Sequence, residues 1–154
     1  MYTVTLEGRG DLGEWREAAR LLLQAGVSPE EVAWQTPETA GGLFADQRQD
    51  LPAPTPEAGV VSVPPDFIKL AGGVICHSDP RRFALLYRLL VRLARDRYTL
   101  AMAADVDVVE ARQMAKSVGR DYHKMTAFVR FKDLPLPPGT AGRRRFVAWF
   151  EPDH

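Results

Sequence analysis

The sequence predicts an α+β fold, in which a small antiparallel sheet packs on about four helices. Alternating apolar and polar residues indicate strands in YTVTLEG at the N-terminus and in TAFVRFK and FVAWFE near the C-terminus. Apolar residues at helical spacing occupy much of the chain between them. The turn-rich stretch DLPLPPGTAGRRR predicts a hairpin with a long loop. Because two strands alone are marginally stable in water, the sheet is expected to combine this hairpin with the N-terminal strand.

The first two helices are bounded by residues that favour helix ends. A helix is expected over residues 12–25, where Asp11 can cap the N-terminus and Gly26 can end the helix. The stretch SPEEV predicts the start of a second, short helix that ends near Trp34. Its serine and second glutamate have the spacing of a capping box, and its proline takes the first helical position.

Helical spacing returns after Pro64 and continues through most of the C-terminal half. The segment HSDPRRFALLYRLLVRLARD has the strongest pattern, with Asp79 expected as the cap and Pro80 at the first helical position. A further helix is expected to begin after Asp105 and to run to residue 125, where the strand pattern takes over.

The chain is expected to form one domain, because 154 residues suffice for a single core. Residues 36–62 are rich in proline, glycine and acidic side chains, which predicts a flexible connection. One short strand is allowed for in it, around Leu43 and Phe44.

Composition limits the classes of function. Lys plus Arg equals Asp plus Glu, 20 against 20, but residues 1–62 carry 4 basic and 10 acidic side chains, and residues 63–154 carry 16 and 10. This asymmetry predicts a C-terminal half that faces a polyanion. A single cysteine excludes a cysteine-rich metal site, and the three histidines lack ligand spacing, so we expect neither a metal nor a cofactor. The lone cysteine, the lack of a long apolar run and the lack of an export signal predict a cytoplasmic protein without membrane contact.

The helix over residues 108–125 separates its side chains into two arcs at about 100° per residue. One arc is apolar and is expected to face the core: Val108, Ala111, Met114, Ala115, Val118, Tyr122 and Met125. The other arc is basic and holds Arg112, Lys116, Arg120, His123 and Lys124.

Two interpretations of the basic arc stay open. Basic side chains complement the dipole near a helix C-terminus, and a polar helix face is usually only solvated. However, none of these cations has an acid at the i,i+4 position, and the basic character continues into Arg130 and Lys132 on the expected strand. We therefore predict that Arg112, Lys116, Arg120, Lys124, Arg130 and Lys132 bind nucleic acid through its phosphates.

His123 is the candidate catalytic residue, because it lies on the basic arc where a bound polyanion would sit. A neutral imidazole there can act as a base or a nucleophile. The alternative is a structural histidine that packs at the corner between the helix and the strand.

Several blocks of the sequence resemble a known family. FALLYRLLVRL, KSVGRDYHKMTAFVRF and RFVAWFEPDH look like signature blocks of the domain of unknown function 4130 family. WREAARLLLQAGVSPEEVAW and VPPDFIKLAGGVICHSDP resemble its N-terminal blocks, so the resemblance covers nearly the whole chain and is weakest over residues 36–62. Members of that family continue well past FEPDH, so the resemblance implies that this chain is C-terminally truncated.

The resemblance implies a role in DNA repair or DNA metabolism. The family occurs alone, beside a radical SAM protein ascribed to DNA repair, or fused to a uracil-DNA-glycosylase-like domain. This chain has no glycosylase motif and no three-cysteine cluster, so whether it is an enzyme stays open. The first hypothesis is an accessory protein that binds DNA through the basic helix and strand. The alternative is a protein-interaction module that docks a radical SAM or uracil-DNA-glycosylase-like repair enzyme.

Overall fold

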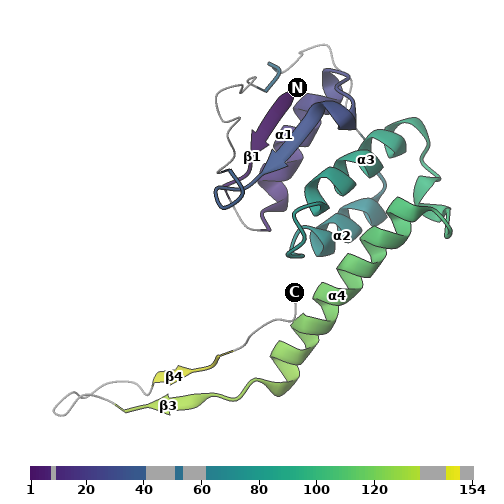
Figure 1. The fold of residues 1–154 in the computed structure, drawn as a ribbon. Helices are drawn as coiled ribbons and strands as arrows, with labels where there is room; N and C mark the ends of the chain where they lie inside the picture. The colour runs from purple at the N-terminus through teal and green to yellow at the C-terminus, as the bar shows by residue number, and fades with distance from the viewer. Residues whose placement is uncertain (8–9, 41–50, 54–61, 136–144, 150–154) are drawn as a thin grey trace.

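The computed structural model of the chain describes residues 1–7, 10–40, 51–53, 62–135 and 145–149. Figure 1 shows a body of helices and one strand pair, from which a long helix and a C-terminal hairpin extend. In chain order the elements are β1 (Tyr2–Thr5), α1 (Leu12–Gln24), the 3-10 turn η1 (Pro29–Glu31), β2 (Val32–Gln35), α2 (Pro65–Val74), α3 (Arg82–Arg95), the 3-10 turn η2 (Thr99–Ala101), α4 (Val106–Phe128), β3 (Lys132–Leu134) and β4 (Arg145–Val147).

The described strands form two separate pairs, which confirms the α+β class but divides the expected sheet. β1 and β2 are parallel, with Tyr2 opposite Val32, and β3 and β4 are antiparallel, with Lys132 opposite Val147. The C-terminal hairpin is therefore confirmed, whereas the N-terminal strand pairs with β2 instead of joining the hairpin. Parallel strands need a crossover connection, and α1 supplies it.

α1 has the start and the caps that the sequence predicts. Asp11 Oδ1 accepts a hydrogen bond from Gly13 N at 2.8 Å. Gly26, just past the helix, has φ +70°, a backbone conformation that favours glycine.

The predicted second helix is a single turn. The capping box is present, since Ser28 N donates to Glu31 Oε2 at 3.1 Å. Helical structure ends at Glu31, however, and residues up to Gln35 extend as β2. The prediction of a helix to Trp34 is wrong because β1 offers these residues backbone hydrogen bonds that the local sequence does not reveal.

α3 starts two residues later than predicted. Asp79 accepts a hydrogen bond from Arg81 N at 2.8 Å and pairs with the Arg81 guanidinium at 2.7 Å, which closes a turn before the helix. The buried Arg82 side chain donates to the carbonyl oxygens of Ile75 (3.1 Å) and Asp79 (3.0 Å). These bonds tie the connection after α2 to the first turn of α3.

α4 begins directly after Asp105, as predicted, but ends later than expected. Asp105 Oδ1 accepts a hydrogen bond from Val108 N at 3.2 Å. The helix then runs to Phe128, so the expected strand TAFVRFK is mostly helix and loop, and β3 begins only at Lys132. Arg130, which was expected on that strand, lies in the loop before β3.

The apolar arc of α4 is buried only in the first half of the helix. Val108, Ala111 and Met114 belong to the core, whereas Tyr122 and Met125 are exposed. The prediction that Tyr122 and Met125 face the core is wrong because α2 and α3 pack on the first half of α4, and the second half extends past them (Figure 1).

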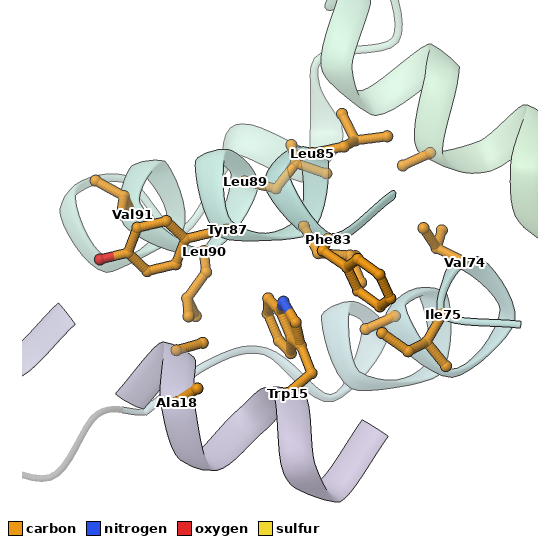
Figure 2. Close-up of a cluster of buried hydrophobic side chains, with 14 of the residues drawn as sticks. Trp15, Ala18, Val74, Ile75, Phe83, Leu85, Tyr87, Leu89, Leu90 and Val91 are labelled. Atoms are coloured by element: carbon orange, nitrogen blue, oxygen red, sulfur yellow. The ribbon is translucent and has the colours of Figure 1, made fainter. Parts of the chain in front are cut away.

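The core joins α1, β2 and α3 through a group of aromatic rings. The Trp15 and Trp34 ring centroids are 6.1 Å apart, and Trp34 lies 5.8 Å from Tyr87 and 6.5 Å from Phe83. Figure 2 shows Trp15 of α1 directed toward the side chains of α3. Val74, the last residue of α2, and Ile75, which follows it, lie close by.

Gly73 allows α2 and α4 to pack closely. A Cβ atom at Gly73 would lie 2.9 Å from the Ala115 Cβ, which is closer than real Cβ contacts permit, and 3.3 Å from the Ala115 Cα. Gly73→Ala is therefore expected to lower the free energy of unfolding by about 1–3 kcal/mol in urea denaturation. The matched control is Gly72→Ala, because a Cβ there meets nothing within 4 Å and alanine favours helix by ~0.5–1 kcal/mol. Equal effects of the two substitutions would contradict this packing.

The buried Tyr87 should make the free energy of unfolding depend on pH in the alkaline range. Its hydroxyl donates to the Val27 carbonyl oxygen at 2.8 Å, and burial raises the pKa of Tyr87 to about 12. The unfolded chain loses this proton at a pH of about 10, while the folded chain keeps it until about 12, so stability should fall as pH rises between those values. The expected slope is about 1.4 kcal/mol per pH unit. In urea denaturation across this range, Tyr87→Phe should lose that slope, and an unchanged slope would refute the assignment.

Part of the segment 36–62 is described. Thr39 N donates to the Thr36 carbonyl oxygen at 2.9 Å, which closes a turn directly after β2. The short strand allowed for around Leu43 and Phe44 lies outside the described residues.

Candidate nucleic-acid interface

Two arginines of α3, Arg88 and Arg92, are neutralised by acids at the start of α4. Arg88 pairs with Asp107 at 2.8 Å, and Arg92 pairs with Asp107 at 3.1 Å and with Asp105. The hydrogen bond from Arg92 holds the pKa of Asp105 below its usual value, so this carboxylate stays charged. These two cations therefore serve to dock α3 on α4.

The cations of the basic arc lie farther along α4 and are all exposed: Arg112, Lys116, Arg120 and Lys124. They recur every four residues, so they follow one side of the helix.

The contacts of these cations leave most of their positive charge uncompensated by carboxylates of the described residues. Arg112 Nη2 donates to the Leu100 carbonyl oxygen at 2.8 Å, and Arg120 Nη2 donates to Ser117 Oγ at 3.3 Å. Lys124 Nζ lies 3.9 Å from Asp121 Oδ1, an acid at the i,i+3 position. Asp121 thus offsets the charge of Lys124, whereas Arg112, Lys116 and Arg120 have no carboxylate partner among the described residues.

Arg130 and Lys132 are exposed beyond the end of α4. Residues directly opposite in an antiparallel pair share a face, as do residues two apart on one strand. Lys132 is opposite Val147, and Leu134 is opposite Arg145, so Lys132 and Arg145 lie on the same face of the hairpin. The hairpin thus adds basic side chains to those of α4.

A groove next to α4 adds cations that the sequence did not indicate. It has a volume of about 690 Å³ and is lined by residues of α2, η2 and α4, among them Lys69, Arg97, Tyr98 and Arg112. Lys69 belongs to α2 and lies far from Arg97 in the sequence, so no local pattern could have grouped them. The stretch RDRY at residues 95–98 is the one local sign of a basic surface here.

His123 is exposed on the extended half of α4. Its carbonyl oxygen accepts a hydrogen bond from Thr126 Oγ1 at 3.1 Å, as happens within helices. The structure thus places His123 within the helix, five residues before its end, and away from the corner where a structural role was considered.

His123→Ala is expected to change the free energy of unfolding by no more than about 0.5 kcal/mol, because the side chain is exposed. Thermal denaturation of the two proteins measures this. A clear fall in melting temperature would show that the histidine is structural, and would remove it as a candidate for chemistry.

The described part of the chain contains no group of three or more His, Cys, Asp or Glu side chains that could hold a metal ion. Among the described helices, none is both long and apolar enough to cross a membrane.

The second half of α4 and the hairpin, which together form the distal end of the structure, expose large apolar side chains. Tyr122 is 66% exposed, Phe128 75% and Trp149 86%, and Phe131 and Phe146 are also exposed. Large exposed aromatic groups are typical of surfaces that contact another molecule.

A family model agrees with the C-terminal part of this architecture. The model described as a domain of unknown function, DUF4130, matches residues 80–154. Residues 80–154 thus belong to the DUF4130 family. The matched residues include α3, α4 and the hairpin, and therefore all six predicted nucleic-acid-binding residues and His123. Neither a curated protein nor a solved structure matches the chain.

Proposed function

We propose that this chain is an accessory protein of DNA repair or DNA metabolism that binds nucleic acid through α4 and the hairpin. The observation that carries the proposal is the contrast between two sets of cations. Arg88 and Arg92 are neutralised by carboxylates within the chain. By contrast, Arg112, Lys116 and Arg120 are exposed and have no carboxylate partner among the described residues. A protein that needed these charges only for folding would be expected to pair them in the same way.

The spacing of the cations suits a phosphate backbone. Residues four apart on a helix are about 6 Å apart along its axis, close to the separation of successive phosphates in an extended strand. Contacts of this type position a protein on nucleic acid without reading the sequence. The assignment to DNA rests on the family resemblance, since the charges themselves suit any nucleic acid.

Fluorescence anisotropy with labelled DNA over a range of salt concentrations tests this function. Six phosphate contacts would give a log–log slope of affinity against salt of about −5 on duplex DNA. A steep salt dependence supports the proposal. Absence of binding at low salt, or binding that does not respond to salt, would overturn it.

A second function is favoured by the exposed aromatic side chains of the distal end. We propose as the alternative that this end docks a radical SAM or uracil-DNA-glycosylase-like repair enzyme. Trp149 and Phe146 then bury apolar area against the partner, as aromatic anchors do in protein interfaces.

Co-purification in the absence of DNA distinguishes the alternative. Phe146→Ser with Trp149→Ser should abolish capture of such an enzyme and leave the salt-dependent DNA affinity in place. Capture that survives the double substitution, or no capture by the unaltered protein, would contradict the docking function.

A further inference from the structure

We propose that the groove between α2, η2 and α4 receives an unpaired nucleotide of a nucleic-acid strand bound along α4. This inference rests on the proposed function and adds a preference for single-stranded or locally unstacked substrate. The groove of about 690 Å³ lies within the range of small-molecule sites and can accommodate one nucleotide.

Tyr98 is the aromatic side chain of the groove. It is 78% exposed, so core packing does not account for it. Its position is nevertheless defined, because Tyr98 N donates to Asp96 Oδ1 at 2.9 Å and the next residue, Thr99, is buried and donates to the Asp96 carbonyl oxygen at 2.8 Å. A ring presented on an anchored turn loses little freedom when a base stacks on it.

The charges of the groove favour an anion. Lys69, Arg97 and Arg112 contribute three cations, and Asp66 is the one carboxylate among the described lining residues. Arg112 uses Nη2 to bond the Leu100 carbonyl oxygen, which fixes the guanidinium at the groove. A nucleotide phosphate held by these cations would place its base near Tyr98.

The groove also has an apolar part, formed by Leu70, Leu100 and Ala115. A base needs an apolar or aromatic surface for its face and a cation for its phosphate, and this lining offers both. Bases in an intact duplex are already stacked on one another, so their faces cannot reach such a surface. The groove therefore discriminates in favour of unpaired bases.

Arg112 connects the groove with the basic arc. It lines the groove, and Lys116 follows one helical turn later on the same side of α4. A strand that contacts Lys116 and Arg120 can thus continue to Arg112 and into the groove.

The test compares an oligothymidine of about 12 nucleotides with a duplex of the same length, both labelled for fluorescence anisotropy. The unaltered protein should bind the single strand more tightly. Tyr98→Ala should weaken single-strand binding about 5- to 150-fold, the equivalent of one stacked base, and should change duplex binding little. Tyr98→Phe should restore the affinity, because phenylalanine keeps the ring.

Tyr122→Ala is the matched control, since it removes another exposed tyrosine that does not line the groove. Two results would overturn the inference while the proposed function stands. In the first, the protein binds DNA but Tyr98→Ala and Tyr122→Ala weaken single-strand binding equally. In the second, the protein binds the duplex more tightly than the single strand. Absence of binding to either DNA overturns both. If Tyr98→Ala instead changes the oligomeric state in light scattering and leaves DNA binding intact, the surface is a protein contact and the inference fails.

Discussion

Replacing Lys116, Arg120 and Lys124 by glutamine is expected to lower the affinity for duplex DNA by roughly two to three orders of magnitude at 0.1 M salt. Each lost phosphate contact removes about 0.9 from the log–log slope of affinity against salt, so the slope should become shallower by almost three. The fold should survive, because all three side chains are exposed and the contacts of Arg120 with Ser117 (3.3 Å) and of Lys124 with Asp121 (3.9 Å) are long. Anisotropy titrations at several salt concentrations, with melting temperature as the check on folding, measure both effects.

The matched control removes the same net charge elsewhere. Arg16 and Arg20 are exposed on α1, and Arg95 is exposed in the last turn of α3. Their triple replacement by glutamine should change the affinity by a small factor and leave the slope nearly unaltered. If the two triple variants lose affinity equally, binding follows net charge alone and the basic arc is no defined interface.

Trp15→Ala is expected to cause the largest loss of stability, about 3–5 kcal/mol. Trp15 is 1% exposed and contacts the rings that join α1, β2 and α3, so its removal leaves a cavity between three elements (Figure 2). For a chain of this size the loss corresponds to a fall in melting temperature of about 6–20 °C. Urea denaturation and calorimetry measure the change.

Two variants test the reason for that loss. Trp149→Ala makes the same substitution at a side chain that is 86% exposed, and should change stability by less than about 0.5 kcal/mol. Trp15→Phe should cost only about 1–2 kcal/mol, because it keeps a ring and removes an indole N–H that has no acceptor among the described residues. If Trp15→Phe is as damaging as Trp15→Ala, the indole makes a polar contact outside the described residues.

The sequence alone was sufficient to predict those features that depend only on residues close together in the chain. Asp11 acts as a helix cap as predicted, and a helix begins after Asp105 as predicted, since a cap needs only backbone N–H groups two or three residues away. The α+β class and the presence of a C-terminal hairpin are likewise confirmed, although its first strand begins only at Lys132, after most of the periodic segment that predicted it. The basic arc of α4 was visible for the same reason, because residues four apart share one side of any helix.

Tertiary structure decided what depends on distant residues. β2 is a strand because β1, thirty residues earlier, pairs with it. Tyr122 is exposed because the last turns of α4 extend past α2 and α3 (Figure 1). The sequence could not separate the arginines of α3 from the cations of α4, since only the packing of α3 against α4 brings Arg88 and Arg92 to Asp107. The groove arises in the same way. Lys69 and Arg112 line one site because Gly73 lets α2 approach Ala115 of α4, a contact across forty residues that no local pattern encodes.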